Sequence, residues 1–194
     1  GAGKTTLFNA LAGLEPPDAG EVLLDGQPMQ GASPTRVFNA GLARTFQRLE
    51  LITSLTVREN IQVAGEIRNR WSLRRRAGID VAGETRRIID LLGLEAVADR
   101  EVAEIPTGQA RIVELGRALM TRPRLLLLDE PASGQDDHET EQFGELLRRL
   151  NGDGMTILLV EHDMSLVMSV CDHVHVLDFG SIIASGTTAE VQSD

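Results

Sequence analysis

Continuous apolar runs and helical patterns alternate along most of this chain. Residues 125–128 are all leucine and are followed by two acids, and residues 155–160 form a second, mainly apolar run. Strands that are buried on both faces have such runs. Apolar side chains recur at helical spacing in four other stretches, residues 5–14, 84–100, 108–123 and 139–154. The alternation predicts an α/β fold built on a mostly parallel sheet.

The remaining stretches predict two smaller β-structures and a helical insertion. Residues 19–29 are typical of a short strand with a turn at Asp25-Gly26, and residues 172–186 are typical of a hairpin. From about residue 55 to 102 the pattern is mainly helical and interrupts the alternation. We therefore expect one domain in which residues 1–47 and 116–194 form the core. Residues 48–115 would form an inserted helical subdomain.

The composition fits this single-domain reading and excludes some classes of protein. The chain has 194 residues, of which 42% are hydrophobic and 25% charged, as in an ordinary globular domain. The single cysteine, Cys171, excludes an internal disulfide framework. No apolar run approaches the roughly 18 residues that a membrane-spanning helix needs.

The charge balance argues against a nucleic-acid partner. The formal net charge is −10, which gives no general attraction to nucleic acid or anionic lipid. Residues 68–76, with Arg86 and Arg87 further on, form a basic stretch that we interpret as the solvated face of a charged helix. Trp71 lies in this stretch and either packs or contacts a partner. Lys4 is the only lysine.

The chain begins with GAGKTT, a sequence typical of a loop that cradles phosphates. Glycines let successive backbone N–H groups point at phosphate oxygens, and the helix that follows adds its N-terminal dipole. A lysine in this position reaches the terminal phosphates, and the threonine after it supplies a hydroxyl to Mg²⁺. The complete motif has one more glycine upstream, so an ordinary glycine turn is the alternative. The residues concerned are Gly1, Ala2, Gly3, Lys4, Thr5 and Thr6.

The acids after the leucine run supply the chemistry that a phosphate loop needs. Asp129 and Glu130 come at the carboxyl end of a predicted buried strand, where α/β sheets bind ligands. Asp129 can hold Mg²⁺ through water, and Glu130 can polarise an attacking water. His173 and His175 alternate with apolar residues and, with Cys171, imitate a metal site. We interpret them as a solvated face of the hairpin.

Six motifs together resemble the ATP-binding subunits of ABC transporters over nearly the whole chain. They are GAGKTT, TFQ, TGQ, LLLLDEP, ASGQD and VEHD, and they occur in that family's order and spacing. The family's signature is commonly Leu-Ser-Gly-Gly-Gln, whereas this chain has Ile-Pro-Thr-Gly-Gln at residues 105–109. Pro106 thus replaces a serine whose hydroxyl would contact the γ-phosphate. The backbone of Gly108 and the helix behind it can still bind an anion.

The resemblance implies a P-loop NTPase (RecA-like) core with a helical subdomain, and it implies roles for individual residues. Gln47 matches a glutamine that senses Mg²⁺ and the attacking water, and His162 matches a histidine at the γ-phosphate. With Glu130 these two would be catalytic. Thr5, Gln47 and Asp129 would serve Mg²⁺. The signature residues Gly108 and Gln109, together with Asp136, would act on nucleotide across a dimer interface.

Within the family, the chain is most similar to importers of branched-chain amino acids. That similarity implies ATP and Mg²⁺ as cofactors and a second ATPase subunit and transmembrane permeases as partners. A periplasmic substrate-binding protein would be an indirect partner, and the subunit would lie peripherally on the cytoplasmic face of the inner membrane. We also expect the family's first strands and first loop glycine to precede residue 1. The alternatives are a soluble ABC ATPase of DNA repair or ribosomes and a regulatory nucleotide binder that does not hydrolyse ATP.

Overall fold

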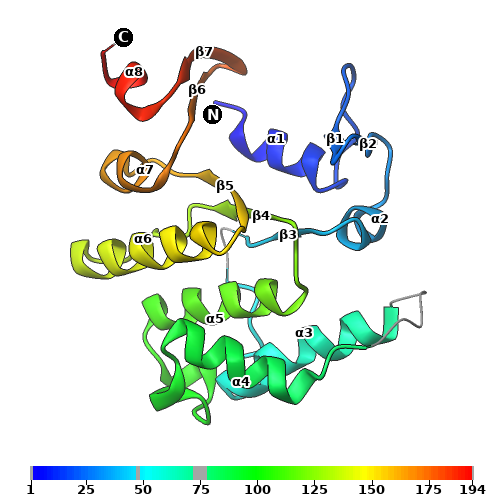
Figure 1. Cartoon of the computed structure of the whole chain (residues 1–194), viewed down its shortest axis with the longest axis vertical. Helices are drawn as coiled ribbons and strands as arrows, with labels where there is room; N and C mark the ends of the chain where they lie inside the picture. The colour runs from blue at the N-terminus through cyan, green and yellow to red at the C-terminus, as the bar shows by residue number, and fades with distance from the viewer. Residues whose placement is uncertain (1, 47–48, 72–77, 194) are drawn as a thin grey trace.

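A three-stranded parallel sheet forms the centre of the protein. In the computed structural model, which describes residues 2–46, 49–71 and 78–193, the strands are β3 (Leu42–Arg44), β4 (Leu125–Asp129) and β5 (Thr156–Val160). Their order is β3-β4-β5, and Asp129 is in register with Val160. The predicted parallel α/β sheet is therefore confirmed (Figure 1).

One face of the sheet is covered by the N-terminal part of the chain. Helix α1 (Lys4–Leu11) and helix α2 (Pro34–Asn39) flank a small antiparallel hairpin of β1 (Leu23–Leu24) and β2 (Gln27–Pro28). Phe8 of α1 packs with Leu127 of β4 in a small core that also includes residues of α2 and β5. Side chains of a strand alternate between its faces, so Leu127 faces α1 while its neighbours face the other way.

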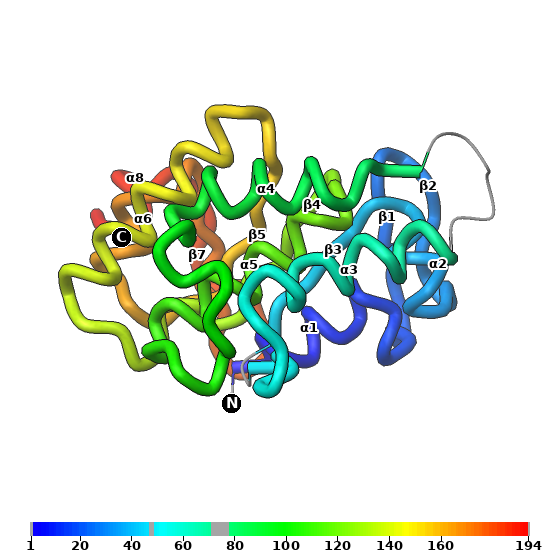
Figure 2. The backbone as a smooth tube through the Cα atoms, turned by 90° about the horizontal axis from the view of Figure 1, so that it is seen from below, coloured from blue at the N-terminus to red at the C-terminus, as the bar shows by residue number. Residues whose placement is uncertain are grey.

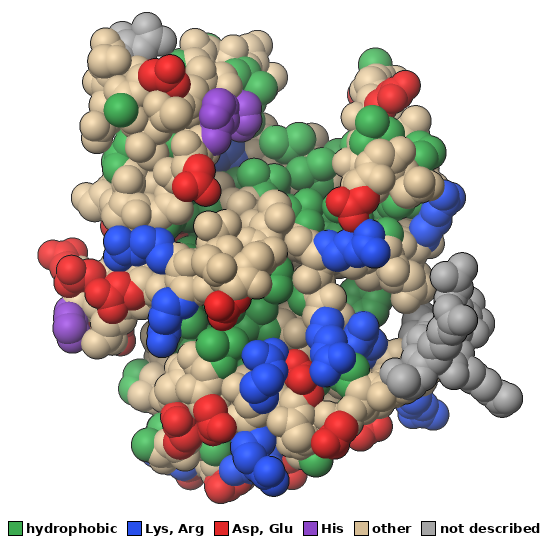
Figure 3. Space-filling view, viewed as in Figure 1, with side chains coloured by type: hydrophobic (Ala, Val, Ile, Leu, Met, Phe, Trp, Pro, Cys, Tyr) green, Lys and Arg blue, Asp and Glu red, His purple; other side chains and the backbone are tan. Residues whose placement is uncertain are grey.

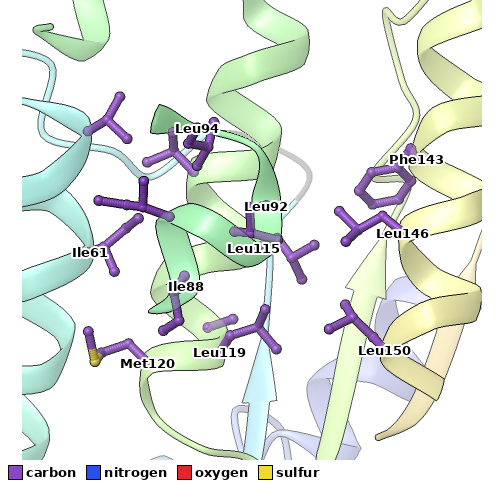
Figure 4. Close-up of a cluster of buried hydrophobic side chains, with 14 of the residues drawn as sticks. Ile61, Ile88, Leu92, Leu94, Leu115, Leu119, Met120, Phe143, Leu146 and Leu150 are labelled. Carbon is purple, nitrogen blue, oxygen red and sulfur yellow. The ribbon is translucent and has the colours of Figure 1, made fainter. Parts of the chain in front are cut away.

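The larger core lies on the opposite face of the sheet. There Leu126 and Leu128 pack against a group of four helices, whose side chains interlock in Figure 4. These helices are α3 (Val57–Trp71), α4 (Val81–Leu92), α5 (Thr107–Met120) and α6 (Asp137–Gly152). Short 3₁₀ turns, η1 (Glu95–Val97) and η2 (Val102–Glu104), connect α4 to α5. Seen from this side, α3, α4 and α5 lie in front of the sheet (Figure 2).

The C-terminal part of the chain adds a second hairpin. Helix α7 (Met164–Val170) leads into β6 (Val174–Asp178), which pairs antiparallel with β7 (Ser181–Gly186), and α8 (Thr188–Ser193) follows. The hairpin lies beside the start of α1 (Figure 1), and its turn donates a hydrogen bond from the backbone N–H of Gly180 to the carbonyl of Ala2, 3.0 Å away. This bond holds Ala2, at the start of the predicted phosphate loop, next to the turn of the second hairpin.

Two expectations from the sequence need correction. The second apolar run was expected to be a strand buried on both faces, but only Val160 of β5 is buried, because β5 has a strand neighbour on one side only among the described residues. The helix expected over residues 84–100 ends at Leu92, where Gly93 adopts a left-handed conformation with φ 67°.

The expected domain boundary at residues 115 and 116 falls within α5, and the division into core and subdomain remains a prediction.

The surface is strongly charged over the helical part of the molecule. Basic and acidic side chains are interspersed over α3, α4 and α5 (Figure 3). Arg68 and Arg70 of the basic stretch lie on α3, whereas residues 72–77 are outside the described ranges. None of the helices described here combines the length and the apolar composition that crossing a bilayer requires.

Candidate functional site

The start of α1 has the geometry that an anion-binding loop needs. Gly3 is the N-cap with φ 92°, a conformation that favours glycine, and no side chain caps the helix. The N–H groups of the first turn are thus left for another acceptor, and they carry the positive end of the helix dipole. Lys4 begins the helix, and Thr5 and Thr6 are exposed. Gly1 lies outside the described residues.

The carboxyl ends of β4 and β5 bring the predicted acids to one edge of the sheet. Asp129 is the last residue of β4 and only 5% exposed, and Arg44 donates to its Oδ2 over 2.9 Å. Glu130 follows with φ 48°, and its N–H donates to the carbonyl of Val160 at 2.8 Å. A non-glycine residue in this region is strained, and such residues cluster at functional sites.

His162 emerges beside these acids, directly after β5. Its side chain is 67% exposed, and its Nδ1 lies 3.6 Å from Oε2 of Glu161, whose own side chain is 1% exposed. Glu161 accepts hydrogen bonds from the N–H of Ala132 at 2.9 Å and from the N–H of His162 at 3.0 Å. This buried carboxylate therefore joins the turn after β4 to the turn after β5.

The predicted signature lies on the other side of the sheet. Pro106 is the N-cap of α5 and leaves the first turn without a side-chain cap. A Cβ at Gly108 would lie 2.6 Å from Oε1 of Glu139, so a carboxylate of α6 approaches this helix end closely. Gln109 is exposed. Asp136 caps α6 and accepts the N–H of Glu139 at 2.8 Å, so this candidate also has a structural role.

Arginines of α5 donate hydrogen bonds to described residues on both sides of Gln47. Gln47 itself lies outside the described residues. On its two sides, Arg111 donates to the carbonyl of Phe46 at 3.2 Å and Arg117 donates to the carbonyl of Glu50. Glu114 lies with them, 7% exposed, and burial raises the pKa of its carboxyl although Arg111 opposes the shift. The segment is thus anchored to α5 at both flanks.

The structure joins some predicted site residues and separates others. Asp129, Glu130 and His162 share one edge of the sheet, and α1 is linked to that edge through Arg44. The helix ends bearing Gly108 and Asp136 belong to α5 and α6, which pack on the face away from α1 (Figure 1). Within one chain, the phosphate loop and the signature are therefore not neighbours.

Sequence reasoning missed Arg44 and Glu161. The side chain of Arg44 is only 7% exposed, and an arginine at the end of a short apolar stretch was the signal that could have identified it. Glu161 stands between a strand and the predicted histidine, and an acid in that position was the corresponding signal. Both connect elements that carry the predicted chemistry.

The oxygen donors at the sheet edge and at the start of α1 are of the kind that Mg²⁺ prefers. The described ranges contain no group of three or more His, Cys, Asp and Glu side chains able to hold a metal. Mg²⁺ needs only one or two protein carboxylates when substrate phosphates complete its shell. The carboxylate of Asp129 and the hydroxyl of Thr5 are oxygen donors of that kind.

The histidines of the second hairpin do not form a rival site. His173 and His175 are exposed and share the hydroxyl of Ser185, at 3.0 and 2.9 Å. Burial raises the pKa of the Cys171 thiol, which disfavours the thiolate that would bind a metal. The two exposed histidines agree with the interpretation as a solvated face, whereas Cys171 is half-buried at the C-cap of α7 and does not.

Comparison with known proteins gives one consistent family. The model of the ABC transporter family matches residues 1–133. The chain is 35% identical to the high-affinity branched-chain amino acid transport ATP-binding proteins BraF of Pseudomonas aeruginosa and LivG of Escherichia coli, covering 100% of this chain and 80% of each relative. It is 36% identical to the methionine import ATP-binding protein MetN of Caulobacter vibrioides, over 98% of this chain and 57% of that protein.

The solved structures that are similar to this chain include ATP-binding cassettes of ABC transporters. An ATP-binding cassette of an ABC transporter superposes with a TM-score of 0.87 at 29% identity, covering 99% of this chain and 79% of the other. A cassette solved in its ADP conformation gives a TM-score of 0.85 at 29% identity, with 100% and 80% covered.

Proposed function

This chain belongs to the ABC transporter family as a subunit that binds and hydrolyses ATP, and on that premise we propose that it powers the uptake of branched-chain amino acids. The observation that carries the proposal is the 35% identity over the whole chain to BraF and LivG. The methionine importer MetN is matched over 57% of its length, compared with 80% for the branched-chain relatives. The transport names of these relatives favour transport over a role in DNA repair or on ribosomes.

The phosphates of ATP would bind at the start of α1. Gly1, Ala2 and Gly3 would supply backbone N–H groups to the phosphates, and the uncapped first turn of α1 would supply more. Lys4 places an ammonium at the terminal phosphates, where a compact charge suits the ligand. Thr6 belongs to the same turn. The left-handed Gly3, held next to Gly180, supports this assignment.

Thr5, Asp129 and Gln47 would hold Mg²⁺ together with the phosphates. When bound, this ion neutralises the charge that develops on the phosphate oxygens during transfer. Asp129 is suited to this role because its carboxylate is fixed at the end of a buried strand. Thr5 is suited because its hydroxyl lies in the exposed first turn of α1.

Hydrolysis would use Glu130 as the general base, which takes a proton from the water that attacks the γ-phosphate. His162 would contact the γ-phosphate from the end of β5, and Gln47 would orient the same water. The proximity of the β4 and β5 ends supports a shared task for Glu130 and His162. The intact base is also evidence against a regulatory binder without hydrolytic activity.

Two subunits would pair head to tail, so that each ATP lies between the phosphate loop of one and Gly108, Gln109 and Asp136 of the other. The separation of these elements on opposite sides of the sheet supports this arrangement, since one chain cannot close both around one nucleotide. The pair would bind transmembrane permeases on the cytoplasmic face of the inner membrane. A periplasmic binding protein would deliver the amino acid to them.

Uptake by intact cells tests the proposed substrate. Deleting the gene should abolish high-affinity uptake of radiolabelled leucine, isoleucine and valine, and the wild-type gene should restore it. A Lys4→Ala gene is the matched control and should fail to restore uptake. Normal uptake of these three amino acids in the deletion strain, with loss of methionine uptake, would contradict the branched-chain assignment but not the ATPase assignment.

A further inference from the structure

One buried arginine connects three of the elements that form the nucleotide site. Arg44 is the last residue of β3, and its Nη2 donates to Oδ2 of Asp129 on β4 over 2.9 Å. Its Nη1 donates to Oδ1 of Asn9 on α1 over 2.8 Å. A single guanidinium therefore ties the acid at the end of β4 to the helix behind the phosphate loop.

Two aromatic rings keep this guanidinium in place. Its central carbon lies 5.4 Å from the ring centroid of Phe8 and 5.2 Å from that of Phe46. Cations within about 6 Å of a ring centroid are attracted to its face. Phe8 is fully buried in α1, whereas Phe46 is 41% exposed. The planar fork can then reach both oxygen acceptors at once, which a lysine ammonium cannot do in the same way.

Stability alone is a poor explanation for this ion pair. The side chains of Arg44 and Asp129 are each 7% exposed, so both charges have been removed from water. Replacing a buried ion pair by well-packed apolar residues is often neutral or stabilising. The alternative explanation is that the pair fixes the orientation of the carboxylate assigned to Mg²⁺.

We propose that Arg44 is a positioning residue for Mg²⁺: it holds the Asp129 carboxylate in one orientation and couples it, through Asn9, to the helix that carries the phosphate loop. The inference rests on the proposed nucleotide site. Residues that hold a metal ligand from behind typically contribute 10–100-fold to metal affinity. Arg44 would act in this way through Asp129 and would not itself be a ligand of the ion.

Nucleotide binding with and without Mg²⁺ separates this role from a structural one. The full-length subunit is titrated with a fluorescent ATP analogue in EDTA and then at increasing Mg²⁺ concentrations. Arg44→Met keeps an unbranched side chain between Phe8 and Phe46 but removes both donors. We expect its apparent Mg²⁺ affinity to fall by about 10–100-fold. Its nucleotide affinity in EDTA should stay within about threefold of the wild type.

Milder variants keep the test decisive if Arg44→Met unfolds. Arg44→Lys retains the charge and should recover part of the Mg²⁺ affinity, and Asn9→Ala should lose less of it than Arg44→Met. The matched control is Arg58→Met, which breaks the exposed pair between Arg58 and Asp99 at 2.7 Å in the helical region and should change neither quantity. Unchanged Mg²⁺ affinity in folded Arg44→Met or Arg44→Lys protein would overturn the proposal.

A double-mutant cycle identifies the route of the effect. If Arg44 acts through Asp129, Arg44→Met should have little further effect on Mg²⁺ affinity in an Asp129→Asn background. The reason is that the effects of mutating two residues in contact do not add. Additive losses would refute this route. A wild-type subunit that bound no nucleotide, or a Lys4→Ala variant that bound it normally in EDTA, would instead overturn the nucleotide site on which the inference rests.

Discussion

Replacing Glu130 by glutamine tests the proposed chemistry most directly. Glutamine has the same shape as glutamate but cannot take a proton from water. General-base assistance is typically worth about 10² to 10⁴ in rate, so kcat should fall by about that factor. At about 1.36 kcal/mol per tenfold, the loss corresponds to roughly 2.7–5.4 kcal/mol of transition-state stabilisation. ATP affinity should change little, because the phosphate loop on α1 is untouched.

The backbone conformation of Glu130 also predicts how substitutions there change the free energy of unfolding. Its φ of 48° lies in the left-handed region and is held by the hydrogen bond to Val160. That region costs a residue with a Cβ about 1–2 kcal/mol. Glu130→Gly should therefore be more stable than Glu130→Ala by about 1 kcal/mol. At an ordinary position the order is the reverse, since glycine in a helix or strand costs about 0.5–1 kcal/mol relative to alanine.

Three assays give these quantities. Phosphate release with Mg-ATP measures turnover, and thermal unfolding compares the glycine and alanine variants, for which about 1 kcal/mol is a Tm difference of about 2–4 °C. Sizing chromatography shows whether Glu130→Gln accumulates as an ATP-dependent dimer, as a site that binds but cannot hydrolyse should. Turnover within threefold of the wild type, or a mutant that stays monomeric with ATP bound, would refute the catalytic assignment. Equal stability of the glycine and alanine variants would refute the strain argument.

The other predictions concern single side chains. Lys4→Ala should weaken ATP binding by about tenfold or more in a nucleotide titration, because a charge-assisted contact is worth about 1.5–3 kcal/mol; unchanged affinity would contradict the phosphate loop. His162→Ala should keep ATP affinity but lower kcat by about 10², the usual cost of one lost contact to a transition state, whereas equal loss of ADP and ATP affinity would point to folding. The hydrogen bond from Arg87, at 2.7 Å, together with Arg122, lowers the pKa of the Glu84 carboxyl. The ionised carboxylate therefore stabilises the folded protein fully above the unfolded pKa of about 4.3. This stabilisation is lost as the pH falls through the lower pKa of the folded state. Urea unfolding from pH 3 to 7 should show that Glu84→Gln removes this part of the acid loss, and an unaltered pH dependence would contradict it.

The elements that local patterning specifies were predictable from the sequence. The leucine run of β4 indicates a strand buried on both faces, and Leu126, Leu127 and Leu128 are all fully buried. The acids that end this run were expected at the sheet edge, and Asp129 and Glu130 lie there. Both expectations depend on neighbouring residues along the chain, whose periodicity reports burial directly.

Partners of buried charges could not be predicted in the same way. Arg44 pairs with Asp129 across 85 residues of sequence, and neither residue indicates the other by spacing. The approach of Glu139 to Gly108 likewise depends on how α6 packs beside α5. Such contacts depend on strand order and helix packing, which a single sequence with local periodicity does not specify. The partial exposure of β5 has the same origin, because it depends on which strands lie beside it.

Charged contacts join the residues on both sides of Gln47 to the sheet edge and to α5. Arg44 ties the start of this segment to Asp129, while Arg111 and Arg117 tie its later part to α5. A rotation of α5 relative to the sheet cannot leave the segment in place unless some of these hydrogen bonds break. Hydrogen bonds to charged groups are worth about 1.5–3 kcal/mol each, and coupling between distant sites typically amounts to 1–3 kcal/mol. Each of these arginine contacts is therefore comparable in energy with a typical coupling between distant sites.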